Sequence, residues 1–257
     1  MSNYPSENPQ LPEDINISTS HPLKDFLVLL VGVGCIVGLL VLSISLLATY
    51  LSPLVPFSWE HQVLESWQQP AVDEPYQQEF ERLLRVFKLV EKQSELETDM
   101  TLHIHHMDSE IPNAFATLGG HIFVTQGLLS QVQSDTGLAM VIAHEIAHVK
   151  HRHPIQALSR GVLIQLVMAV ILGDNGMANS LISPSGTMLA LKFNRDMEYQ
   201  ADETAVAIIK RSFETLDGAD EFFRIALEEH GSSGWSDVFQ THPDMAARLV
   251  RIRQALK

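Results

Sequence analysis

One apolar run constrains this chain more than any other feature. It extends from Phe26 to Leu51 without a single charged side chain. A helix needs about 20 apolar residues to cross a bilayer, and this run is longer. A buried helix of a soluble protein rarely stays apolar on every face for so many turns. A cleaved signal peptide has an apolar core of only about 7–15 residues behind a basic start. We therefore expect one retained transmembrane helix over residues 26–51, in contact with membrane lipid.

The charge balance and the cysteine content exclude two kinds of site. The formal net charge is −14, whereas the phosphates of nucleic acids are bound through an excess of Lys and Arg. We therefore expect no nucleic-acid partner. The one cysteine, Cys35, lies inside the apolar run, so the chain can form neither an internal disulfide nor a cysteine-rich zinc site. Any bound metal must use His, Asp or Glu ligands.

The segments on either side of this run differ in composition. Residues 1–25 are polar, rich in Pro, Asn and Ser, and without periodicity, which predicts a disordered tail. Residues 52–75 hold Pro53, Pro56 and Pro70 between short polar stretches, which predicts a linker or a wrapping segment. From residue 76 onward apolar residues recur at regular spacing, so we expect a globular domain over residues 76–257.

The pattern within 76–257 predicts an α+β domain that is mostly helical and has a small antiparallel sheet. Strands are expected over 100–106, 114–116 and 121–125, with a turn at Leu118-Gly119-Gly120. Helices are expected from residue 80, over 137–150 with Asp135 as N-cap, and over 155–172, 188–210, 217–230 and 243–256, with a loop at 173–186. The apolar part of 155–172 is too short to span a membrane, so it predicts a core helix or a hairpin that dips into the bilayer.

The sequence His144-Glu145-Ile146-Ala147-His148 is an HExxH motif. On a helix, residues four apart lie on one face, so both imidazoles can bind one metal ion. Glu145 then stands beside the water that the metal activates. Short motifs also arise by chance, and the alternative is two surface histidines on an ordinary helix. Nearby His151 and His153 are expected on the surface rather than as ligands.

A second pair with the same spacing offers the missing ligand. Catalytic zinc sites use three protein ligands and keep one position open. Glu198 and Asp202 lie on one face of a predicted helix, where Glu198 can complete a His2Glu site and Asp202 can accept a bond from the free nitrogen of His144. An exposed acidic helix face is the alternative. The apolar neighbours Ala201 and Ala205 predict burial instead, and a buried carboxylate requires a cation.

Four segments in this order resemble the M48 family of zinc peptidases. They are Asn113–Ala116 followed by Gly119–Thr125, the helix of His144–His153, the ExxxD pattern of Glu198–Asp202, and Thr241-His242-Pro243 with Arg248. The resemblance implies a zincin-like (gluzincin) fold with one Zn2+ per chain. The chain resembles the compact single-domain, membrane-anchored bacterial members of the family more than the members with several membrane spans.

The resemblance also implies roles for individual residues. His144, His148 and Glu198 would hold the zinc and Glu145 would be the catalytic base. Asp202 and Arg248 would support them, and His242 would lie near the developing oxyanion. The residues that would contact substrate are Asn113, Ala114, His121, Ile122 and Phe123, with His121–Thr125 as an exposed edge strand to which an extended polypeptide adds.

The function expected from these residues is zinc-dependent endoproteolysis of misfolded or membrane-associated proteins. The alternative is a zinc-stabilised scaffold that holds substrates in membrane protein quality control without cutting them. An intact Glu145 favours the enzyme, because a scaffold would not need a base there. Lys24 precedes the apolar run, and the first Lys or Arg that follows the run is Arg82. The positive-inside bias thus predicts a single-pass protein with a cytoplasmic tail and a periplasmic or otherwise extracytoplasmic peptidase domain.

Overall fold

The structure is a computed structural model that describes residues 22–64, 72–159, 193–229 and 235–257. The chain forms two units, Met1–Leu42 and Ser43–Lys257. The predicted tail up to residue 21, the predicted loop at 173–186 and most of the predicted helix over 155–172 lie outside the described residues. The structure describes residues 153–159 as helical, and these include the start of that predicted helix.

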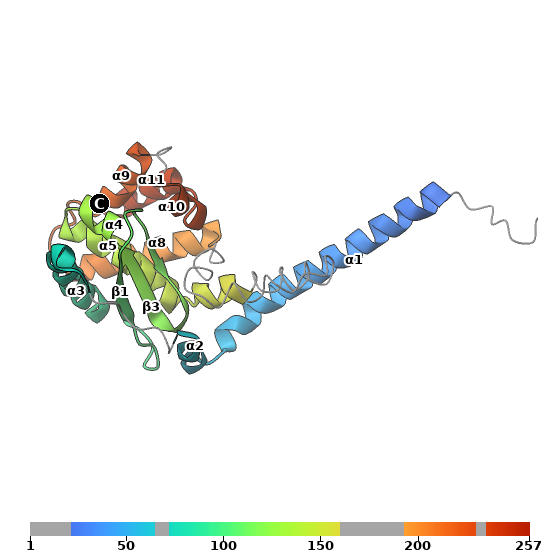
Figure 1. Cartoon of the computed structure of the whole chain (residues 1–257), viewed down its shortest axis with the longest axis horizontal. Helices are drawn as coiled ribbons and strands as arrows, with labels where there is room; N and C mark the ends of the chain where they lie inside the picture. Colours follow the sequence, from blue (N-terminus) through green and yellow to red (C-terminus); the bar gives the residue numbers. More distant parts are fainter. Residues whose placement is uncertain (1–21, 65–71, 160–192, 230–234) are drawn as a thin grey trace, which may run out of the picture. The chain divides into compact units, whose positions relative to one another are not determined.

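Helix α1 (Pro22–Leu51) contains the apolar run and confirms the helix predicted there (Figure 1). Its segment Pro22–Ile44 is long and apolar enough to cross a membrane. Large apolar side chains are exposed on every face, as the consecutive residues Val28, Leu29, Leu30 and Val31 show. Exposure on all faces is unfavourable in water and suits a hydrocarbon environment.

A three-stranded sheet forms the centre of the second unit. The strands are β1 (His103–Met107), β2 (Ala114–Ala116) and β3 (His121–Thr125), in the order β1-β3-β2. β2 pairs with β3 in antiparallel register, as predicted, but β1 pairs with β3 in parallel, so the sheet is mixed rather than antiparallel. The alternation of apolar residues identifies the faces of a strand but not its neighbours, and for this reason the sequence did not predict the pairing of β1.

The turn before β3 depends on glycine. The 3-10 turn η3 (Leu118–Gly120) joins β2 to β3, as predicted, and both of its glycines have positive φ. A Cβ atom on Gly120 would lie 1.9 Å from the carbonyl oxygen of Thr101. No side chain fits there, so glycine allows the turn to pack closely against the chain that precedes β1.

Helices pack against the sheet and share a core with it (Figure 1). Helix α5 is buried on all faces and contacts α3, α8, α9 and β2. Its N-cap is Ser134, which accepts from Gly137 N at 3.0 Å, rather than the predicted Asp135. The short helices α4 and α10 were not predicted. The helices of this unit are α2 (Phe57–Leu64), α3 (Gln77–Lys92), α4 (Gln126–Gln131), α5 (Asp135–Lys150), α8 (Arg195–Ser212), α9 (Glu221–Glu228), α10 (Ser236–Thr241) and α11 (Met245–Ala255), with 3-10 turns at Ser52–Leu54 and Glu74–Tyr76.

The segment that follows α1 packs against the rest of the second unit. Phe57 is 1% exposed, and the Glu60 carboxylate is buried. Glu60 Oε1 accepts two hydrogen bonds from Arg152, from Nη2 at 2.5 Å and from Nε at 3.1 Å, while its Oε2 accepts from Gly119 N at 3.1 Å. α2 thereby joins the turn before β3 to the residues just after α5.

Candidate metal centre

Helix α5 holds three of the predicted site residues in its last two turns. His144, Glu145 and His148 are all buried. The Nε2 atoms of His144 and His148 lie 3.0 Å apart, so the two imidazoles converge on one point. The i, i+4 spacing of a helix places them there. The alternative of two surface histidines is wrong, because His148 is completely buried.

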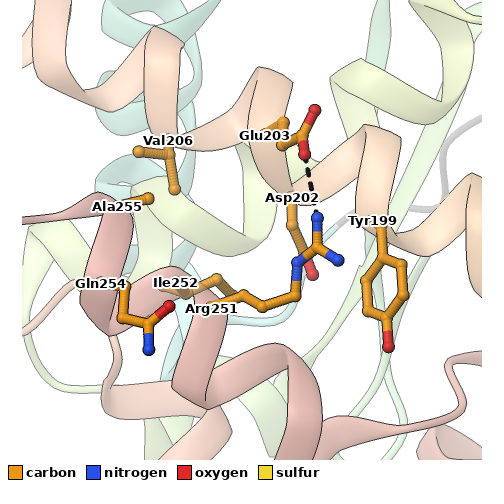
Figure 2. Close-up of a pocket in the computed structure, with 8 residues that line it drawn as sticks. All are labelled: Tyr199, Asp202, Glu203, Val206, Arg251, Ile252, Gln254 and Ala255. Atoms are coloured by element: carbon orange, nitrogen blue, oxygen red, sulfur yellow. Dashed lines mark hydrogen bonds and ion pairs between the residues drawn. The ribbon is translucent and has the colours of Figure 1, made fainter.

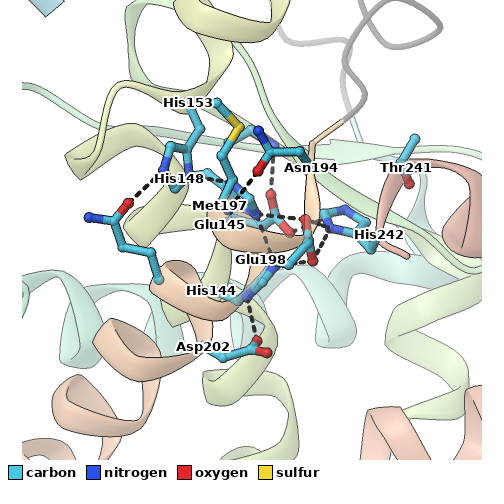
Figure 3. Close-up of polar contacts among 12 residues, drawn as sticks. His144, Glu145, His148, His153, Asn194, Met197, Glu198, Asp202, Thr241 and His242 are labelled. Carbon is cyan, nitrogen blue, oxygen red and sulfur yellow. Dashed lines mark hydrogen bonds and ion pairs between the residues drawn. The ribbon is translucent and has the colours of Figure 1, made fainter. Parts of the chain in front are cut away.

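Helix α8 brings Glu198 to the same point. Asn194 caps this helix by accepting from Met197 N at 3.0 Å, so α8 begins later than predicted and Glu198 lies in its first turn. The carboxylate oxygens of Glu198 lie 3.5 Å from His144 Nε2 and 3.4 Å from His148 Nε2 (Figure 3). Glu198 is completely buried, so the alternative of an exposed acidic helix face is wrong for this residue.

His242 completes the cluster. It is the C-cap of α10, and its Nδ1 lies 3.2 Å from Glu198 Oε1. Ligand atoms of His144, His148, Glu198 and His242 all lie within 4.8 Å of one another. His242 Nε2 is buried without a hydrogen-bond partner among the described residues. A compact set of imidazoles and one carboxylate, with one nitrogen left unpaired, fits a bound metal ion.

The electrostatics of the cluster favour a cation. Burial alone would raise the pKa of Glu198, but His242, Arg248 and the hydrogen bonds from His144 and His148 hold it well below its ordinary value. Burial and the Arg248 charge lower the pKa of His144, yet the hydrogen bonds to Asp202 and Glu198 outweigh them and raise it to about 9. The buried carboxylates therefore attract positive charge, which a metal ion supplies.

Asp202 and Arg248 surround the cluster, as expected from the resemblance. Asp202 Oδ1 lies 3.0 Å from His144 Nδ1, the nitrogen that faces away from the cluster. Arg248 donates to both Asp202 oxygens at 2.8 Å and also pairs with Glu198. Its guanidinium carbon lies 5.0 Å from the centre of the Phe223 ring. Arg248 is thus buried against two carboxylates and fixes their positions.

Glu145 faces the sheet. Its Oε2 accepts from the backbone N–H of Ala116 at 2.7 Å, and its Oε1 lies 3.8 Å from His242 Nε2. Asn113 and Thr117 form backbone hydrogen bonds with β3. Because every second residue of an antiparallel strand bonds to the same neighbour, Phe115 also faces β3, opposite Phe123. By alternation, the backbone groups of Ala114 and Ala116 point away from β3, toward the helix that carries Glu145.

This arrangement corrects the position expected for His121–Thr125. β3 lies between β1 and β2 and is the central strand, with all five residues buried, so it is not an exposed edge. The strand that presents backbone groups to the cluster of metal-ligand residues is β2. Of the expected substrate contacts, Asn113 and Ala114 lie on this side of the sheet, whereas His121, Ile122 and Phe123 lie one strand further away.

Two further features lie at β2, because Asn113 directly precedes this strand and Ala114 lines a cavity. The side-chain amide of Asn113 is buried, and neither of its polar atoms has a hydrogen-bond partner among the described residues. A small cavity of about 10 Å³ next to Glu145 and His144 has a mostly apolar lining. Its apolar residues are Ala114, Met140, Val141, Phe222, Phe223 and Met245. An unpaired buried amide and an apolar cavity beside a metal cluster are features of a ligand site.

Of the two histidines expected on the surface, His151 is half-buried and His153 is buried. His153 is 2% exposed, and its Nδ1 lies 2.9 Å from His148 Nδ1. Its position depends on a chain reversal at Arg152, which has a φ of 59°. His105 and His121 bond to each other at 2.8 Å in the sheet. Burial lowers the pKa of His105 to about 3 and that of His153 to about 4, so both are neutral near pH 7.

A roomier groove of about 540 Å³ lies between α8 and α11 (Figure 2). Arg251 spans it, with its guanidinium 4.1 Å from the centre of the Tyr199 ring and 3.0 Å from Glu203 Oε1. Of the metal-site residues only Asp202 reaches this groove. Because its walls hold no group of metal ligands, we place the chemistry at the smaller cavity beside Glu145.

Comparison with known proteins agrees with this geometry. The model of peptidase family M48 matches residues 74–256. The mitochondrial metalloendopeptidase OMA1 of Schizosaccharomyces pombe is 30% identical over 163 residues, which are 62% of this chain and 48% of that protein. The beta-barrel assembly-enhancing protease of Escherichia coli is 27% identical over 163 residues, 59% of this chain and 34% of that protein.

A homolog of protease HtpX from Dictyoglomus thermophilum is 29% identical over 223 residues, 71% of this chain and 72% of that protein. In contrast, the chain spans less than half the length of OMA1 and of the assembly-enhancing protease. The matched family region holds the sheet, the HExxH helix and every member of the His144–His148–Glu198–His242 cluster. The chain therefore belongs to peptidase family M48.

Proposed function

We propose that this chain is a zinc-dependent endopeptidase that cleaves misfolded or membrane-associated polypeptides. His144, His148 and Glu198 would hold the zinc ion, which suits imidazole and carboxylate ligands. When bound, the ion supplies Lewis acidity that activates water and polarises the scissile carbonyl. The observation that carries the proposal is the position of Glu145, buried beside the metal ligands and bonded to the sheet edge at Ala116.

Each residue then has one task in the reaction. Glu145 takes a proton from the attacking water and returns it to the leaving amine. His242 Nε2, unpaired and 3.8 Å from Glu145, can donate to the oxyanion that develops on the carbonyl. Asp202 orients His144 through Nδ1, and Arg248 holds Asp202 in place.

The substrate would lie along β2. The outward backbone groups of Ala114 and Ala116 can pair with an extended peptide, which must displace the bond between Ala116 and Glu145. The unpaired amide of Asn113 offers a further polar contact. The cavity next to Glu145 holds only about 10 Å³ and would have to widen on binding, and its apolar lining then favours an apolar side chain beside the scissile bond. Backbone pairing with one apolar pocket suits unfolded segments of varied sequence.

The experiment compares wild type with Glu145→Gln, using the purified chain in detergent and an unfolded protein as substrate. Glutamine keeps the size of the side chain but cannot take the proton. We expect unchanged metal content and a turnover reduced by about 10²–10⁴-fold or more. Glu203→Gln, an exposed change on α8, is the control. Binding of unfolded protein without fragments, in wild type and variant alike, would instead establish the scaffold function.

We further propose that α1 spans the membrane once, with the second unit on the extracytoplasmic side. Support comes from the length of the apolar segment Pro22–Ile44 and from Lys24 as the only nearby positive charge. Protease added to intact spheroplasts should degrade the second unit and spare the N-terminal end. The opposite protection pattern would reverse the orientation and place the substrates in the cytoplasm.

A further inference from the structure

The two histidines of the motif have different outer partners. A histidine that binds a metal through Nε2 carries its proton on Nδ1, and that N–H needs an acceptor. For His144 the acceptor is the Asp202 carboxylate at 3.0 Å. For His148 the group facing Nδ1 is another imidazole, His153 Nδ1, at 2.9 Å (Figure 3).

Only one arrangement of protons satisfies this pair. His148 must donate from Nδ1, so His153 must accept at its own Nδ1 and carry its proton on Nε2. His153 Nε2 lies 3.1 Å from Gln200 Oε1, which accepts that proton. The chain His148–His153–Gln200 thus sets the tautomer of both histidines, and its last member is on α8, between Glu198 and Asp202.

Within the part of the chain that the structure describes, His153 is the residue that bonds His148 Nδ1. His148 is completely buried and His153 is 2% exposed, so water does not reach the two Nδ1 atoms that face each other. The Phe193 ring stacks on His148 with centroids 3.9 Å apart and closes another side of the imidazole. Without His153, the Nδ1–H of His148 would be a buried donor with no acceptor among residues 22–64, 72–159, 193–229 and 235–257.

We propose that His153 is a positioning residue of the metal centre, which acts through its Nδ1 acceptor on His148 and is held in the required tautomer by Gln200. The role rests on the proposed metal site, because it concerns how His148 presents Nε2. A neutral acceptor here adds no negative charge to a cluster that already holds three buried carboxylates, those of Glu145, Glu198 and Asp202.

Two substitutions of similar size separate the acceptor from the packing. In His153→Asn, the side-chain oxygen stands where Nδ1 stood and keeps the acceptor; in His153→Leu, the acceptor is lost. The full chain in detergent, stripped of metal, is titrated with zinc against a chromophoric chelator. We expect His153→Leu to bind zinc about 10–100-fold more weakly and His153→Asn to remain close to wild type. Gln200→Leu should weaken binding less, and should add little to His153→Leu.

Controls distinguish failure of this inference from failure of the metal site. His106 also forms a bond with a glutamine, to Gln126 Oε1 at 3.0 Å on the sheet side, so His106→Leu should lose stability without losing zinc affinity. If His148→Ala binds zinc like wild type, the proposed metal site itself is wrong. If His148→Ala loses zinc while His153→Leu and His153→Asn behave alike, the acceptor role is refuted. If His153→Leu does not fold, the zinc affinity of Gln200→Leu tests the same contact.

Discussion

Replacing Glu60 by alanine should destabilise the second unit strongly, although this residue is far in sequence from the motif. The Glu60–Arg152 pair is buried, with side chains 5% and 11% exposed. Alanine would leave the Arg152 guanidinium without its counter-ion and the N–H of Gly119 without its acceptor. Removing one partner of a buried pair costs about 3–5 kcal/mol. For a unit of this size that corresponds to a fall in Tm of about 6–20 °C.

Thermal unfolding of the metal-free chain in detergent, followed by circular dichroism, measures this loss. Glu203→Ala is the matched control, because Glu203 pairs with Arg251 at 3.0 Å but is 71% exposed. An exposed pair contributes about 0–1 kcal/mol, so the control should unfold close to wild type. Equal Tm values for the two variants would show that α2 is not held by this pair and would refute the reasoning.

The remaining predictions concern the metal, the oxyanion and pH. Glu198→Ala should lose stoichiometric zinc in elemental analysis, whereas Glu203→Ala on the same helix should keep it; full zinc in the former would exclude Glu198 as a ligand. His242→Phe should lower kcat by about 10²–10³-fold, as when an oxyanion donor is removed, with a smaller rise in KM; a defect in KM alone would contradict that role. Burial holds the pKa of His105 at about 3 and of His153 at about 4, below the ordinary 6.5. The unfolded chain therefore binds more protons, and the free energy of unfolding of the metal-free protein should fall as pH drops from about 6.5 toward 4. A midpoint of urea unfolding that stays constant across that pH range would contradict this prediction.

Local spacing predicted the centre of the site but not its surroundings. The pairs His144/His148 and Glu198/Asp202 each lie on one helix face, as the i, i+4 rule requires, and the packing of α5 against α8 brings the two pairs together. The position of β3 could not be read the same way. The predicted turn gives its antiparallel partner β2, but its other partner, β1, is set by a parallel crossover that depends on the packing of the whole unit. The strand edge that faces Glu145 is therefore the edge of β2.

His153 was missed for a different physical reason. Five residues after His148, it would point away from the cluster if α5 continued as a helix. Instead α5 ends at Lys150, and Arg152 adopts a left-handed conformation that returns His153 to His148. A non-glycine residue pays for that conformation and keeps it only where its surroundings hold it. Nothing in the spacing of the motif reveals such a reversal.

The contacts that hold Arg152 come from the segment after α1. Its guanidinium donates to Glu60 and to the Val55 carbonyl at 2.7 Å, and lies 5.3 Å from the centre of the Phe57 ring. α2 thus fixes the reversal that positions His153, and through His153 it supports the metal ligand His148. Glu60→Ala should therefore weaken zinc binding as well as lower the Tm. In a double-mutant cycle, the losses in zinc affinity of Glu60→Ala and His153→Leu should be less than additive, because both act through the same contact. Additive losses would show that α2 stabilises the unit without reaching the metal centre.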